Sequence, residues 1–216
     1  MRSTDLSHVW LFLADTLSDS TSHDDATSKT IYSRIVSIIY GLVRLRRDLV
    51  TNSLPHLAHT LSRLLECLLA VRQDLGATQR RSITSTFPHW IQPSQPLDAE
   101  DAKATARLLE SLTTRTEIHS ASYTASSVGM AESLAHPLSK HAPYVLVAYI
   151  RALTNPLGFF STEIRRELEP GLFALCSMMN KHVRDSIMIS MLDGGERAML
   201  KLIWGKYEKQ KYVGRG

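Results

Sequence analysis

Apolar residues recur at helical spacing through most of this chain, and this periodicity limits the possible fold more than any other feature. The clearest example lies between Pro55 and Asp74. Its apolar positions are Leu57, Leu61, Leu64, Leu65, Leu68 and Leu69. No segment between turn signals shows the clean alternation of apolar and polar residues that half-buried strands require. The pattern predicts an all-α fold of about eight or nine helices.

A second strong helix is predicted over residues 31–50, just before the leucine-rich one. Its apolar stripe is predicted to be Ile31, Ile35, Ile38, Ile39, Leu42, Leu45 and Leu49. The connection between the two helices is short, which predicts an antiparallel hairpin, the unit of both bundles and solenoids. The chain has no exact internal repeat. An irregular helical bundle and a short α-solenoid of the HEAT or armadillo type therefore both stay open.

The chain has 216 residues, enough to bury a substantial core, and we expect one helical domain over residues 1–216. Three loops are expected, over about residues 18–28, 76–97 and 118–136. Prolines exclude a helix from the second loop. The apolar residues among those prolines predict that this loop packs onto the body of the protein: Phe87, Trp90 and Ile91.

Four further patterns define the rest of the helical core. Asp98 is predicted to cap a helix that ends near Glu117, and its thin apolar stripe places it on the outside of the core. The apolar run from Tyr144 to Ile150 predicts a central, mostly buried helix. Pro170 is predicted to kink a helix or start a new one. Asp193 and Glu196 have the spacing of a capping box at the start of the last helix. The residues predicted to face inward from that helix are Ala198, Met199, Leu202, Ile203 and Tyr207.

Sequence signatures of catalysis and of cofactor binding are absent. The chain has neither a GxxxxGK[ST] nor a GxGxxG phosphate-binding loop, and it has no GxSxG nucleophile elbow. His56 and His59 could share a helix face, but no third ligand follows at a suitable spacing. Cys67 and Cys176 lie in apolar helical runs and are predicted to be buried, reduced thiols. We therefore expect no catalytic residue, no cofactor and no metal, and predict that the protein is not an enzyme.

Positive charge and aromatic rings gather near the C-terminus. The formal net charge of +4 permits a nucleic acid or an acidic partner without requiring either. Bases stack on aromatic rings and phosphates pair with lysines, so this tail is a candidate RNA-binding or partner-binding surface. Alternatively, Trp204 and Tyr207 fill the core while the lysines favour the helix dipole. The candidate residues are Lys201, Lys206, Lys209, Lys211 and Arg215, together with Arg165 and Arg166 on a preceding helix.

The last part of the chain is similar to a known family. The patterns that carry the resemblance are KHAPYVLVAYI from Lys140, RELEPGLFALCSMM from Arg166, and MLDGGERAMLKLIWGKYEKQKYVG from Met191. They resemble the C-terminal domain of the fungal nucleolar pre-rRNA processing family called unhealthy ribosome biogenesis protein two, or Npa-two. The resemblance covers about residues 140–216 and is diffuse before them.

This resemblance implies a non-enzymatic helical scaffold or interaction domain in the nucleolus. Its implied process is early large-subunit (pre-60S) assembly and pre-rRNA processing. Its implied partners are a large sister scaffold protein, a pre-ribosomal complex containing a DEAD-box helicase, and pre-rRNA. No membrane is expected among them, because the best apolar stretch is about half as long as a bilayer span. Two other functions stay open: a direct RNA-binding module, and a cytosolic helical adaptor unrelated to ribosomes.

Overall fold

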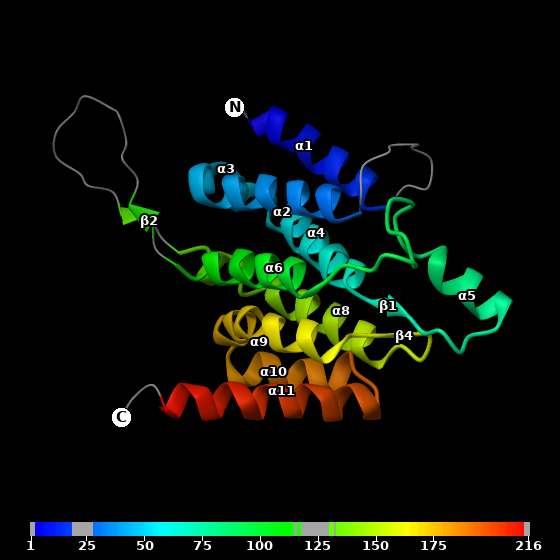
Figure 1. Ribbon diagram of the computed structural model, residues 1–216. Helices are drawn as coiled ribbons and strands as arrows, with labels where there is room; N and C mark the ends of the chain where they lie inside the picture. The colour runs from blue at the N-terminus through cyan, green and yellow to red at the C-terminus, as the bar shows by residue number, and fades with distance from the viewer. Residues whose placement is uncertain (1–2, 19–27, 115, 118–129, 132, 214–216) are drawn as a thin grey trace.

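Among the described residues, the regular secondary structure is almost entirely helical (Figure 1), which confirms the predicted all-α class. The computed structural model describes residues 3–18, 28–114, 116–117, 130–131 and 133–213. Its helices are α1 Ser3–Thr16, α2 Ser28–Leu45, α3 Arg47–Val50, α4 Leu54–Cys67, α5 Ala77–Thr84, α6 Ala99–Ser111, α7 Ala135–Leu138, α8 Ala142–Thr154, α9 Thr162–Ser177, α10 Lys181–Ser190 and α11 Gly194–Val213. Two antiparallel pairs of two-residue strands complete it: β1 Ala70–Val71 with β4 Gly158–Phe159, and β2 Thr116–Glu117 with β3 Met130–Ala131.

The helices stack in chain order from one end of the molecule to the other (Figure 1). One row consists of α2, α6, α9 and α11, and each of these helices packs on the next. A second row consists of α4, α8 and α10, and α8 also packs on α9 and α11. A single hydrophobic cluster runs through both rows, from Leu6 to Trp204. The arrangement thus combines the stacked rows of a solenoid with the shared core of a bundle.

The rotation of α2 and its packing partner differ from the prediction. Ile35 and Ile39 from the predicted stripe are buried, as expected. Tyr32 and Val43, which lie outside that stripe, are also buried, whereas Ile38 and Leu45 from it are 44% and 80% exposed. The Tyr32 hydroxyl lies 2.6 Å from the Thr105 hydroxyl and donates to the Leu64 carbonyl at 3.2 Å, which turns this side of α2 inward. The predicted helix also breaks at Arg46, before the short α3. The predicted hairpin is wrong, because α2 packs mainly on α6 and α4 mainly on α8.

Two of the predicted loops contain secondary structure. Helix α5 lies inside the predicted loop 76–97, because it ends at Thr84, before the first proline. The rest of that loop packs onto the body as predicted: the rings of Phe87 and Trp90 are buried, and Trp90 Nε1 donates to the Thr16 carbonyl at 2.8 Å. Strand β3 and part of α7 lie within the predicted loop 118–136. Residues 19–27, 118–129 and 132 of the predicted loops lie outside the described residues.

Helix α6 was predicted to lie on the outside of the core, but it is central. It lies between α2 and α9, and it ends at Ser111, earlier than expected. Its cap is confirmed, because Asp98 Oδ1 accepts from the backbone N–H of Glu100 at 3.0 Å. Ala106 in the thin apolar stripe of this helix lets the neighbouring backbone come close: a Cβ built on Gly171 of α9 would lie only 2.8 Å from the Ala106 Cα.

Helix α9 begins at a serine cap and continues through its proline. Ser161 accepts from the Ile164 N–H at 3.2 Å and caps the start of α9. Pro170 lies inside this helix, so the second of the two predicted alternatives, a new helix that starts at Pro170, is wrong. The prediction for α8 is confirmed: its side chains are mostly buried, and only Tyr144, Arg151 and Thr154 of this helix are exposed.

Candidate interaction surface

The last helix, α11, starts at a capping box. The Glu196 N–H donates to Asp193 Oδ1 at 2.8 Å, and the Asp193 N–H donates to Glu196 Oε2 at 3.0 Å. These reciprocal bonds satisfy donors that would otherwise be unpaired at the helix start, and they confirm the predicted box. They also set the start of the helix that carries the C-terminal lysines.

The buried side of α11 is rotated from the predicted one. Of the residues predicted to face inward, Ile203 is buried and Met199 and Tyr207 are half-buried against the core, but Ala198 and Leu202 are exposed. Leu200 and Trp204, outside the predicted set, are buried. Leu202 has 56% of its surface accessible. Because the large Trp204 ring takes an inward position, the opposite side of the helix carries a leucine among its lysines.

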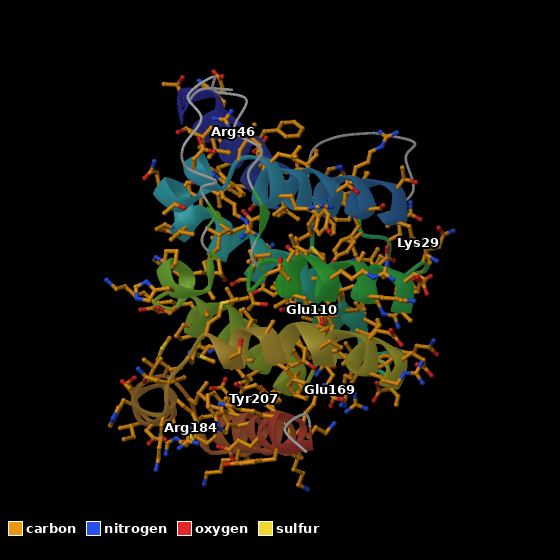
Figure 2. The ribbon with its side chains drawn as sticks, turned by 90° about the vertical axis from the view of Figure 1, so that its left-hand side faces the viewer. Lys29, Arg46, Glu110, Glu169, Arg184 and Tyr207 are labelled. Atoms are coloured by element: carbon orange, nitrogen blue, oxygen red, sulfur yellow. The ribbon has the colours of Figure 1, made fainter. Side chains whose placement is uncertain are left out.

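Two aromatic rings of the tail pack within the protein. Trp204 is buried, donates through Nε1 to Glu208 Oε1 at 2.9 Å, and has the Arg184 guanidinium 5.2 Å from its ring centroid. Tyr207 is half-buried, with its ring centroid 5.5 Å from that of Trp204 and 6.1 Å from that of Phe173. Figure 2 shows Tyr207 between α9 and α11. These contacts favour the interpretation in which both rings belong to the core.

The C-terminal lysines do not form one uniform face. Lys206 reaches across to α9 and pairs with Glu169, which Figure 2 shows between the two helices. Lys201 and Lys209 are exposed, and Lys211 lies over the Tyr207 ring, with Nζ 5.9 Å from the centroid. Arg215 lies outside the described residues. The lysines of α11 therefore have different surroundings: one pairs with a carboxylate of α9, and another lies over a ring of α11 itself.

The two candidate arginines of α9 lie close to part of this lysine set. Arg165 and Arg166 are both exposed, and Arg166 forms an ion pair with Glu167 at 3.2 Å. Arg166, Lys206 and Lys209 line one hollow of about 390 Å³. The structure thus brings together cations that lie some 40 positions apart in the sequence.

A second hollow of about 480 Å³ adjoins the first, and both are lined by Arg166, Glu169, Phe173 and Lys206. We call the two together the α9–α11 groove. Its apolar floor comprises Leu153, Leu172, Phe173, Met199, Leu202 and Ile203. Its cationic rim comprises Arg165, Arg166, Lys206 and Lys209. Lys201 and Lys211 do not line it.

Tyr149 is a buried residue that lines the α9–α11 groove. Burial raises the pKa of its hydroxyl to about 12, while Arg165 lowers this pKa and Glu169 raises it. The ring of Phe160 lies 5.3 Å away, centroid to centroid. Tyr149 is therefore a neutral packing residue at neutral pH, and the charge of the groove comes from its rim.

Another hollow, of about 410 Å³, lies along the exposed side of α8, and sequence reasoning did not find it. Its cations are matched by nearby carboxylates: Arg63 pairs with Glu66 at 2.5 Å, and Arg151 pairs with Glu196 at 3.6 Å. Its lining residues come from α4, α8 and the loop after α5, which only the fold places side by side. This hollow lacks the excess positive charge of the α9–α11 groove.

Within the part of the chain that the structure describes, no cluster of His, Cys, Asp and Glu has the grouping of a metal site. Among the same residues, no helix combines the length and the hydropathy needed to cross a bilayer.

The fold and this surface define a stacked, all-helical protein with a cationic groove between two of its C-terminal helices. The chain belongs to the Urb2/Npa2 family, whose model matches residues 1–215. This match extends well before residues 140–216, to which the sequence resemblance was confined. No curated protein and no solved structure matches the chain. The Urb2/Npa2 family is a nucleolar family of ribosome biogenesis, so family membership implies a role in that process.

Proposed function

We propose that this protein is a non-enzymatic scaffold that acts in the nucleolus, in early large-subunit assembly and pre-rRNA processing. Membership of the Urb2/Npa2 family is the observation that supports this role. The stacked rows of helices suit a scaffold, because stacked helices present an extended surface to partners while each layer is held by its neighbours. The proposed partners are a large sister scaffold protein and a pre-ribosomal complex that contains a DEAD-box helicase.

The α9–α11 groove is the proposed contact surface for a protein partner. Its rim gathers four of the seven candidate cations, and its floor exposes Leu202 beside them. Leu202 forms one apolar patch with Leu153, Phe173 and Met199, and an apolar patch rimmed by polar groups is typical of protein interaction sites. This surface gives the scaffold a defined place at which to hold a partner.

Direct binding of pre-rRNA is the second candidate function. The cations of α11 and the ring of Tyr212, which is 73% exposed, support it. Binding to RNA through lysines weakens steeply as salt rises, because each neutralised phosphate releases counterions. A slope near zero between low and physiological salt would contradict RNA contact by this tail.

Co-purification from a nucleolar extract tests the proposed role. The tagged chain is expected to enrich large-subunit precursor rRNA over mature rRNA, relative to the tag alone. Recovery of no precursor would contradict the ribosomal role and favour the cytosolic adaptor. Mature cytoplasmic subunits serve as the control for nonspecific attraction of ribosomes to a basic protein.

A further inference from the structure

The floor of the α9–α11 groove is suited to apolar side chains. It lies where α8, α9 and α11 meet, and Leu202 and the half-buried Leu153, Phe173 and Met199 contribute to it. Flexible methionine and leucine side chains adapt to an inserted apolar residue more readily than β-branched ones do. Burial of leucine-type side chains here would remove apolar surface from water on both partners, which stabilises binding.

The rim of the same groove is suited to carboxylates. Arg165, Arg166, Lys206 and Lys209 line the groove, where Arg166 pairs with Glu167 and Lys206 with Glu169, which leaves an excess of two cations over these two carboxylates. Glu169 already pairs with Lys206 across the groove. A carboxylate is thus accommodated between α9 and α11, and the remaining cations offer places for more.

The aromatic rings near the groove are poorly placed for nucleobases. Phe173 and Tyr207 pack on each other, and Arg184 covers Trp204. Exposed rings on which bases can stack are the usual platform for single-stranded RNA. Tyr212 is exposed, but it does not line either hollow. An apolar floor with a cationic rim therefore fits a peptide better than it fits RNA.

We propose that the α9–α11 groove binds an acidic amphipathic helix of a partner protein, with leucine-type residues on the floor and carboxylates on the rim. Helices that dock in apolar grooves use anchors at i, i+3 or i+4, and i+7, which places them on one side. This inference rests on the proposed function, because it specifies the partner chemistry at the proposed contact surface.

Fluorescence anisotropy of synthetic peptides on the purified full chain tests the inference. The probe is a labelled helical peptide of about 18 residues, with leucines at the anchor spacing and glutamates elsewhere. One comparison peptide keeps the leucines and replaces glutamate with lysine, and the other keeps the glutamates and replaces leucine with serine. We expect saturable binding of the leucine–glutamate peptide, and binding at least about tenfold weaker for both comparison peptides.

Two variants locate the binding site on the protein. The double variant Arg165→Glu/Lys209→Glu reverses rim charge, and Leu202→Ser removes an exposed part of the floor. Each should weaken the binding by about tenfold or more. The matched controls, Arg34→Glu/Arg81→Glu and Ile189→Ser, change exposed residues of the same kinds elsewhere and should leave the binding unchanged. Because all these side chains are exposed, the variants should retain their fold, which circular dichroism checks.

Three results would overturn the inference: no saturable binding, equal binding of the lysine peptide, or equal loss in the control variants. Displacement of the peptide by a single-stranded RNA of about the same length, lost in the same rim variant, would identify the groove as an RNA site instead. The proposed function is tested by a different experiment, so its failure can be distinguished from failure of this inference. Loss of precursor rRNA in the co-purification contradicts the ribosomal role whatever the peptide does, and peptide failure with intact co-purification contradicts only the partner chemistry.

Discussion

Gly171 lets the backbones of α9 and α6 approach each other. A Cβ at this position would lie 2.8 Å from the Ala106 Cα and 3.1 Å from the Ala106 carbonyl oxygen. These are backbone atoms, so the two helices would have to move apart. We expect Gly171→Ala to lower the free energy of unfolding by about 1–3 kcal/mol, as overpacking does. Urea unfolding followed by circular dichroism measures this change.

Gly205 of α11 provides the matched control for Gly171. It also lies inside a helix, but a Cβ there would meet nothing within 4 Å. Gly205→Ala should therefore raise the free energy of unfolding by about 0.5–1 kcal/mol, because alanine costs less backbone entropy in a helix. Equal effects of the two substitutions would show that α9 and α6 are not in close contact.

Cys67 and Cys176 are free and buried, as the sequence predicts. Burial raises the pKa of each thiol to about 12, compared with about 8.5 in an unfolded chain. The folded pKa values are the higher ones, so the contribution to stability is complete below about pH 8.5 and declines as the pH rises toward 12. We expect Ellman's reagent to titrate both thiols in urea and to react only slowly with the folded chain.

A cysteine-free variant tests whether the thiols cause the loss of stability at alkaline pH. The variant Cys67→Ala/Cys176→Ala should lose less of its free energy of unfolding between neutral pH and about pH 10 than the natural chain does. Burial is the largest cause of the raised pKa of Tyr32, to which Cys67 also contributes, and it keeps this hydroxyl protonated up to about pH 10 in both folded proteins, so the difference between the two slopes belongs to the thiols. Identical slopes would contradict the shifted thiol pKa values.

At the scale of the element, the rotation of α2 has a direct test. Val43 is fully buried, and Val43→Ala should lower the free energy of unfolding by about 1–3 kcal/mol through lost packing. Leu45 is mostly exposed, and Leu45→Ala should change it by no more than about 0.5 kcal/mol. The apolar stripe inferred from the sequence contains Leu45 and not Val43, so it predicts that Leu45→Ala destabilises the protein more than Val43→Ala does. Thermal or urea unfolding of the two variants distinguishes these rotations.

Local sequence signals predicted where helices begin, and tertiary contacts decided how they face. The caps at Asp98, Ser161 and Asp193 act within four residues, so the sequence contains the whole interaction. Helix α2 has apolar residues on more than one side, and contacts with distant helices choose between them. Arg47 is buried and donates to the carbonyl oxygens of Ser111 and Thr114, which no local pattern indicates.

The candidate site was predictable in its charges and not in its shape. The sequence marked the basic tail, but the groove needs Arg165 and Arg166 from α9 beside Lys206 and Lys209 from α11. It also needs Leu202 to face outward, whereas the apolar spacing predicted that this residue faces inward. Both features depend on the packing of α11 against α8 and α9, which brings residues from separate parts of the chain together.

At the scale of the whole molecule, the stacked layers should differ in local stability. Helices α6, α8 and α9 lie in the middle of the two rows and bury most of their apolar side chains. Helix α5 buries only Ile83 among its residues, and α10 buries only Ile187. Segments with few buried contacts open at lower free energy than the global unfolding reaction. Hydrogen exchange should therefore show α5 and α10 opening by local fluctuations, and α6, α8 and α9 opening only with the whole protein.

The Gly171→Ala variant provides a quantitative test of these differences in local stability. If α6 and α9 exchange only through global unfolding, the substitution should lower the opening free energy of their amides by its full effect on unfolding. The amides of α5 and α10 should keep their values, because their local opening leaves the contact between α6 and α9 intact. Equal protection of α10 and α9, or an equal decrease in all helices, would show that the molecule opens as one unit.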